Sequence, residues 1–167
     1  MLTAHELFGF MSPALAGEIL AFAYEMDKPL YRTTMGAVAE ARKVRPVFLE
    51  RQPRSERHTA MLHTLARPSL EATAGNLLRA WLVKKQKAML VDFLDGLGIA
   101  HNEGVVDDLP ASIEDDKLRA AVDALLAKYP AETVAVYLQA FNEMNQANWP
   151  NLKTLLENEP RLQLGGA

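Results

Sequence analysis

Apolar side chains recur three or four residues apart along most of this chain, which is the spacing of one face of an α-helix. The clearest run places Leu118, Val122 and Leu125 on a single face, since a helix turns once in about 3.6 residues. Alternation of apolar and polar residues, the pattern of a half-buried strand, is confined to a short hairpin-like segment at 99–106. The sequence therefore predicts an all-α protein.

Prolines divide this pattern into segments of uneven length. Ser12 followed by Pro13 is typical of an N-cap residue and the first position of a helix. Proline lacks the amide hydrogen that a helix interior needs, so each further proline forces an abrupt turn. Those prolines are Pro46, Pro53, Pro68 and Pro130. Unequal helices joined in this way favour an irregular multi-helix bundle of about six or seven helices over a regular four-helix bundle.

The longest helical pattern covers residues 69–97 and predicts one long central helix. Gly96 and Gly98 stand at its end, where glycine readily adopts the left-handed conformation that stops a helix. The residues that follow, 98–111, form the one long loop that the pattern predicts. We expect a single helical domain of residues 1–167, and we place any subdomain boundary in that loop.

Several classes of protein are excluded by residues that are missing. The chain of 167 residues has no cysteine, which rules out disulfides, thiolate metal sites and cysteine nucleophiles. Its N-terminus lacks the positive charge of a signal peptide, and no segment approaches the roughly 18–20 apolar residues of a membrane span. We therefore expect a cytoplasmic protein that has no membrane partner.

Motifs for catalysis are absent or wrongly spaced. His58 and His63 are five residues apart, so their rings point about 140° apart on a helix and do not share a metal ion. Gly96, Gly98 and Gly104 follow a predicted helix, whereas a dinucleotide-binding glycine turn follows a strand. No HExxH, GxSxG or phosphate-loop motif is present. We predict no catalytic residue, no metal ligand and no cofactor.

Two carboxylates, Asp92 and Asp95, are unusual for their position. They lie three residues apart near the C-terminal end of the predicted central helix, where the helix dipole disfavours a negative charge by about 0.3–1 kcal/mol. Such a pair suits acid–base chemistry or the binding of a cation. The favoured alternative is that solvent, or the basic middle of the chain, compensates their charge.

Charge is segregated along the sequence. Residues 1–41 carry a net charge of −3, residues 42–87 carry +8 and residues 88–167 carry −8. Eight basic residues of the middle segment are candidates for a surface that binds an anion or a partner. They are Arg45, Arg51, Arg54, Arg57, Arg67, Lys84, Lys85 and Lys87.

Three classes of function are compatible with this pattern. The favoured one is a non-enzymatic protein-interaction or regulatory helical module, whose basic segment meets an acidic protein surface or the acidic part of a second copy. The first alternative is nucleic-acid or anionic-ligand binding through residues 42–87, although Trp81 is the only Phe, Tyr or Trp between Leu49 and Met89. The second alternative is a small-ligand pocket or an enzyme site between helices. Its residues would be Asp92, Asp95, His58, His63 or His101.

Overall fold

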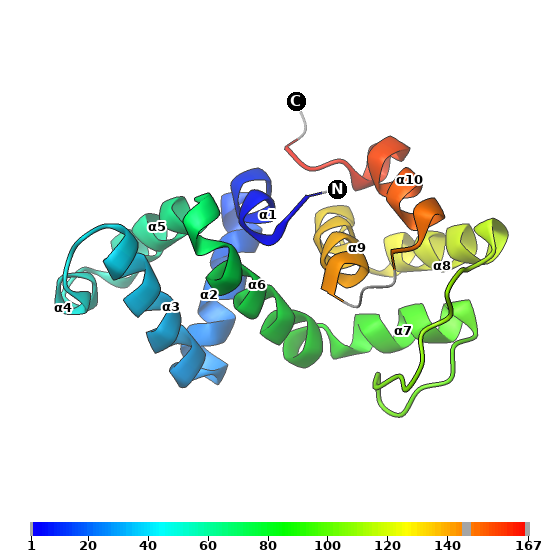
Figure 1. The fold of residues 1–167 in the computed structure, drawn as a ribbon, viewed down its shortest axis with the longest axis horizontal. Coiled ribbons are helices and arrows are strands. Elements are labelled where there is room, and N and C mark those ends of the chain that lie inside the picture. The colour runs from blue at the N-terminus through cyan, green and yellow to red at the C-terminus, as the bar shows by residue number, and fades with distance from the viewer. Residues whose placement is uncertain (1, 145–147, 166–167) are drawn as a thin grey trace. The chain divides into compact units, whose positions relative to one another are not determined.

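Helices make up every regular element of the computed structural model, which describes residues 2–144 and 148–165 (Figure 1). Within those residues there are ten α-helices and no β-strand. They are α1 (Ala4–Phe10), α2 (Pro13–Met26), α3 (Lys28–Ala41), α4 (Pro46–Glu50), α5 (Arg54–Leu65), α6 (Glu71–Ala80), α7 (Lys87–Leu97), α8 (Asp115–Lys128), α9 (Ala131–Met144) and α10 (Pro150–Asn158). Short 3₁₀ turns cover Pro68–Leu70 and Pro160–Leu162, and a π-helical turn covers Trp81–Lys85. The predicted all-α class is confirmed.

The predicted count of six or seven helices is wrong, since the described residues form ten. One additional helix, α1, begins behind Thr3, whose backbone amide donates to Glu6 Oε2 at 3.2 Å in a capping box. A second, α4, has only five residues and begins at Pro46, where the prolines predicted no more than an abrupt turn. The third arises because the predicted central helix is divided.

A π-helical turn interrupts the single long helix that was predicted over 69–97, so that prediction is wrong. The π turn and a bend at Gln86 separate α6 from α7. In a continuous helix Lys85 would lie on the same face as Trp81 and Leu82, and both of these side chains are buried. The wider turn leaves Lys85 exposed. Lys84 and Lys85 therefore face solvent because the helix widens over the π turn.

Contacts within the chain divide it into two compact units. The N-terminal unit is residues 2–81, and the C-terminal unit begins at Leu82. This division falls in the π turn, while the 98–111 loop lies within the C-terminal unit and joins α7 to α8. The single domain with a boundary in that loop stays a prediction.

The core of the N-terminal unit is shared by α1, α2, α3, α5 and α6. Its fully buried apolar side chains include Leu7, Ile19, Leu20, Val38, Met61, Leu65 and Leu77. Glu71 of α6 caps α1 by accepting hydrogen bonds from the backbone amides of Ala4 and His5 at 2.9 Å each, and it also contacts the His5 ring. Burial of Glu71 opposes its ionisation, but these hydrogen bonds outweigh that effect and lower the pKa of its carboxyl group.

An aromatic cluster occupies the core of the C-terminal unit, which is built from α7, α8, α9 and α10. The ring centroid of Phe141 lies 5.2 Å from that of Phe93 and 5.7 Å from that of Trp149, and all three side chains are buried. The indole Nε1–H of Trp149 donates to the carbonyl of Pro110 at 2.8 Å. This hydrogen bond fastens the end of the long loop to the core.

Two glycines at the end of α7 have different roles. Gly98 has φ 70°, and its amide donates to the carbonyl of Asp95 at 3.1 Å, so Gly98 makes the predicted left-handed helix stop. Gly96 lies inside α7, where a Cβ atom would stand 3.2 Å from the Cβ of Ala121 on α8. Gly96 therefore permits the close packing of α7 against α8, a role that the sequence pattern did not indicate.

Candidate functional site

Asp92, the first of the two unusual carboxylates, is held by the neighbouring helix. Its Oδ2 accepts a hydrogen bond from Lys128 Nζ at 2.8 Å and another from the Tyr129 hydroxyl at 2.6 Å. These two hydrogen bonds, with that of Lys128 the stronger influence, lower the pKa of the Asp92 carboxyl group. The helix dipole is thus opposed by local partners at the end of α8.

Asp95, the second carboxylate, pairs with His101 in the loop that follows α7. His101 Nε2 lies 2.7 Å from Asp95 Oδ1, and the amide of Gly104 donates to His101 Nδ1 at 3.0 Å. Because Nδ1 accepts a hydrogen bond, the ring proton resides on Nε2 and is donated to Asp95. Both ring nitrogens therefore form hydrogen bonds within the protein. These bonds fasten the loop to α7 and leave neither nitrogen free for proton transfer.

The turn that His101 anchors is a tight one. Asn102 and Val105 exchange two backbone hydrogen bonds of 2.9 Å, which is all that forms of the hairpin-like segment at 99–106. Glu103 and Gly104 both have positive φ, 52° and 88°, as a type I′ turn requires. The two carboxylates are thus parts of a fastened α7–loop–α8 face, and their described partners come from the C-terminal unit rather than from the arginines of the basic segment.

The basic candidates fall into two sets that belong to different units. Arg45, Arg51, Arg54, Arg57 and Arg67 lie in the N-terminal unit, around α4 and α5. Lys84, Lys85 and Lys87 lie in the C-terminal unit, in and after the π turn. Lys87 Nζ pairs with Glu103 at 3.3 Å, and Arg67 Nη1 donates to the carbonyl of Ala41 at 3.4 Å. Three of the candidates, Arg45, Arg51 and Arg54, lie at the two ends of α4 and at the start of α5.

We call residues 42–54 the α4 corner, because they connect α3 to α5 through the short helix α4 at one end of the N-terminal unit (Figure 1). Every residue of the corner is exposed except Leu49, which is 2% exposed and anchors α4. Five of its residues are basic and one is acidic. The basic residues are Arg42, Lys43, Arg45, Arg51 and Arg54.

Apolar side chains are exposed among these charges. Phe48 is 56% exposed, Val44 is 40% exposed and Val47 is 37% exposed. A helix of five residues has one face to bury, and Leu49 occupies it, so its neighbours are left facing solvent. The sequence pattern pointed to the arginines but not to this apolar surface, because α4 is too short to show a helical period.

The backbone at the start of the corner is strained in a way that sets its direction. Lys43 has φ 57°, the left-handed conformation that glycine normally supplies at a helix end. Its amide donates to the carbonyl of Glu40 at 3.1 Å, and the amide of Val44 donates to that of Ala39 at 3.0 Å. These two hydrogen bonds form a Schellman motif, which ends α3 and turns the chain toward Pro46.

The arginines of the corner differ in their partners. The guanidinium of Arg54 lies 4.5 Å from the ring centroid of Tyr24 and 3.6 Å from Glu25 Oε1. The side chains of Arg45 and Arg51 make no hydrogen bond or ion pair with any residue that the structure describes. Two guanidinium groups are therefore available to a partner, and they flank α4 at its two ends.

A tyrosine–histidine pair forms a wall beside Arg54. The hydroxyl of buried Tyr31 lies 2.8 Å from Nε2 of half-buried His58, and the Tyr24 ring packs edge-on against Tyr31 at 5.1 Å. Burial, followed by the positive charges of Arg54 and Arg57, lowers the pKa of His58 to about 4. His58 is therefore neutral at pH 7. Tyr24, Tyr31 and Glu50 help to line an open groove of about 390 Å³ next to α4.

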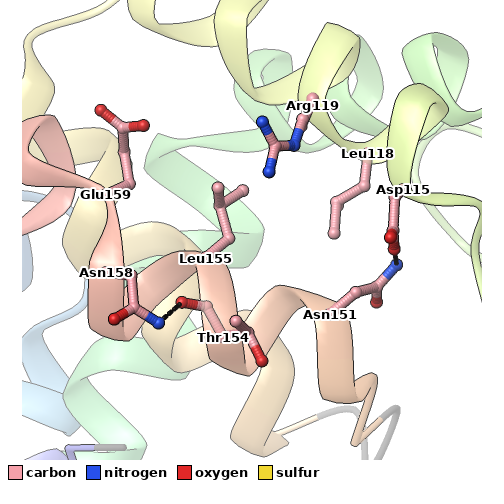
Figure 2. Close-up of a pocket in the computed structure, with 8 residues that line it drawn as sticks. All are labelled: Asp115, Leu118, Arg119, Asn151, Thr154, Leu155, Asn158 and Glu159. Carbon is pink, nitrogen blue, oxygen red and sulfur yellow. Dashed lines mark hydrogen bonds between the residues drawn. The ribbon is translucent and has the colours of Figure 1, made fainter.

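A second groove, of about 310 Å³, lies between α8 and α10 in the C-terminal unit (Figure 2). Arg119 of α8 points into it, and the carboxylates of Asp115 and Glu159 lie toward its two ends (Figure 2). Asn151 donates to Asp115 Oδ1 at 2.9 Å, and Asn158 donates to the carbonyl of Thr154 at 2.8 Å. None of these residues was a candidate from the sequence, because their convergence depends on how α10 packs.

The described part of the chain holds neither a metal-binding cluster nor a membrane-spanning helix. Among residues 2–144 and 148–165, no group of three or more His, Asp or Glu side chains is placed to hold a metal ion. In the same part of the chain, no helix has both the length and the apolar character to cross a bilayer. Comparison of the chain with protein-family models, curated proteins and solved structures found no match.

Proposed function

We propose that this protein is a non-enzymatic interaction module whose α4 corner binds an acidic, amphipathic segment of a partner protein. The observation that carries this proposal is the exposure of Phe48, Val44 and Val47 among five basic residues, of which Arg45 and Arg51 offer guanidinium groups without a described partner. Exposed apolar side chains that are rimmed by charge are typical of protein-binding surfaces.

Both parts of the corner contribute to the chemistry that we infer for the partner. Burying Phe48 and its neighbours would stabilise a complex by about 25 cal/mol for each Å² of apolar surface removed from water. The unpaired guanidinium groups of Arg45 and Arg51 would bind carboxylates and raise the association rate. A partner segment that carries apolar side chains on one face and carboxylates beside them satisfies both requirements.

The same surface is a weaker match for nucleic acid. A nucleic-acid site combines phosphate contacts with aromatic stacking platforms, and Val44 and Val47 provide no ring on which a base can stack. Phe48 is the one aromatic residue of the corner. Aliphatic side chains gain most when they are covered by apolar protein surface, so the apolar share of the corner favours a protein segment.

Fluorescence anisotropy with a labelled peptide tests the proposal. The probe is a synthetic acidic amphipathic helix of about 15 residues, with Leu and Phe on one face and Glu elsewhere. We expect a dissociation constant on the order of 1–50 µM that weakens as salt is added. Phe48→Ser and Arg51→Glu should each weaken binding by about tenfold, because each removes a central contact.

Matched controls separate the corner from general charge and stickiness. Phe10→Ser removes a phenylalanine that is 50% exposed on α1, and Arg79→Glu reverses an exposed arginine on α6; both should bind the probe like the unaltered protein. Equal binding of a polyglutamate peptide, or tighter binding of single-stranded DNA, would contradict the proposal. Loss of binding through dimerisation, seen by light scattering at the same concentrations, would instead assign the corner to a second copy.

A further inference from the structure

Arg119 is a cation that lines the α8–α10 groove, where its charge adds to the hydrogen bonds from Arg161 in lowering the pKa of the Glu159 carboxyl group. Its guanidinium makes no hydrogen bond or ion pair with any described residue. Asp115 and Asp123, four residues before and after it on α8, are at the spacing that pairs charges along a helix. Asp115 instead accepts from Asn151 at 2.9 Å, and Asp123 accepts from Arg161 at 2.8 Å.

The carboxylates of the groove also keep acceptor capacity. Glu159 accepts hydrogen bonds through Oε1 alone. The donors are the backbone amide of Arg161 at 3.3 Å and Arg161 Nε at 2.8 Å. Asp115 accepts a hydrogen bond from the Asn151 side chain through Oδ1 alone. One oxygen of each carboxylate is therefore without a described hydrogen bond, and Glu159 and Asp115 lie toward opposite ends of the groove (Figure 2).

Apolar side chains lie between these charged ends. Leu118 is buried beneath the groove, and Leu155 is half-buried with part of its side chain facing the open space. The volume of about 310 Å³ is at the small end of the range for ligand sites, which suits a molecule of about ten non-hydrogen atoms. The groove thus combines a donor group, free acceptors and an apolar surface.

We propose that the α8–α10 groove binds a zwitterionic ligand of amino-acid size with an apolar side chain. Arg119 binds the ligand's carboxylate through two parallel N–H donors, which is the geometry that a guanidinium group favours. A free oxygen of Glu159 or Asp115 accepts from the ligand's ammonium group, and the ligand's side chain covers Leu155. A phosphate dianion fits less well, because two carboxylates and one guanidinium give the lining a net charge of −1.

Chemical-shift mapping of the ¹⁵N-labelled protein with L-leucine tests this site independently of the α4 corner. We expect shifts at the side-chain amides of Asn151 and Asn158, with a dissociation constant on the order of 1–10 mM. Leucinamide, which lacks the carboxylate, and N-acetylleucine, which lacks the ammonium group, should each bind about tenfold more weakly. Arg119→Gln should likewise weaken leucine binding by about tenfold, and Arg79→Gln on α6 should leave it unchanged.

Three results would overturn the proposal. The first is an absence of shifts at about 20 mM leucine, well above the expected dissociation constant. The second is leucine binding by Arg119→Gln that is as tight as that of the unaltered protein, while the backbone spectrum of α8 shows an intact fold. The third is equal binding of acetate or inorganic phosphate, which would make the groove an anion site without a role for Asp115 and Glu159.

Discussion

The α7–α8 face provides partners for its charged side chains, whereas the α4 corner leaves two of its arginines without a described partner. Asp92 and Asp95 stand where a helix dipole disfavours them, yet Lys128, Tyr129 and His101 lie within hydrogen-bond distance of their oxygens. In the corner, the guanidinium groups of two arginines have no described partner and apolar side chains face solvent. We expect substitution of a side chain that is paired within the fold to change stability. We expect substitution of a side chain without a partner in the fold to change binding.

The largest stability effect should come from overpacking the α7–α8 face. Gly96→Val places a branched side chain where even a Cβ atom would stand 3.2 Å from Ala121 Cβ. We expect the free energy of unfolding to fall by about 2–3 kcal/mol, measured by urea denaturation. Gly17→Val on α2 is the matched control, since a Cβ at Gly17 meets nothing within 4 Å. Equal effects of the two substitutions would show that the α7–α8 contact is not tight.

A pH-dependent effect is expected from the wall beside the corner. Because the pKa of His58 is about 4 in the folded protein and 6.5 in the unfolded chain, only the unfolded chain takes up a proton between these values. Stability should therefore be complete above pH 6.5 and fall as the pH drops toward 4. We expect the loss to be about 1–2 kcal/mol, reduced by solvent because His58 is only half-buried.

His58→Gln isolates that contribution, since glutamine does not titrate but can still form a hydrogen bond with Tyr31. Urea denaturation of both proteins between pH 7 and about pH 4 should give a smaller loss for the variant. Parallel curves for the two proteins would mean that His58 takes up its proton equally in the folded and unfolded states, and that the burial of this pair is without consequence.

Removal of one hydroxyl tests how far the α7–α8 face depends on its paired carboxylate. Tyr129→Phe deletes the 2.6 Å hydrogen bond to Asp92 and leaves Lys128 in place. We expect the free energy of unfolding to fall by about 0.5–1.5 kcal/mol and the pKa of Asp92, followed by ¹³C NMR, to rise. An unchanged Asp92 pKa would show that the tyrosine contributes nothing to holding this carboxylate.

The smallest of these stability effects, and the only one with the opposite sign, concerns the corner. Lys43 has φ 57°, a left-handed conformation that strains lysine but not glycine. Lys43→Gly should therefore raise the free energy of unfolding by about 0.5–1 kcal/mol. Gly98→Lys, the reverse change at φ 70°, should lower it by a similar amount in chemical denaturation. A destabilising Lys43→Gly would mean that the lysine side chain supports the corner.

The limits of the sequence pattern are physical and can be traced to particular residues. Long apolar runs such as that of α8 predicted the helical class, because burial of one face repeats over several turns. α1 was missed although Thr3 and Glu6 form a capping box, and α4 was missed because five residues show no period. The π turn is a response to tertiary burial, which local spacing does not reveal.

Prediction of the candidate sites had similar limits. The arginines of the corner were visible as a charge run, but the exposure of Phe48 depends on Leu49 taking the only buried position of α4. The partners of Asp92 and Asp95 lie 36 and 6 residues away, so only the fold shows which of them are close. The groove at Arg119 likewise requires α8 and α10 to pack together.

The central claim, that the α4 corner binds an acidic amphipathic segment, is tested most directly by titrating ¹⁵N-labelled protein with the acidic amphipathic peptide. We expect the largest amide shifts at residues 42–54, and we expect Phe48→Ser to weaken the binding about tenfold while changing the free energy of unfolding by less than about 0.5 kcal/mol. Shifts centred elsewhere, or a dissociation constant that Phe48→Ser leaves unchanged, would contradict the claim.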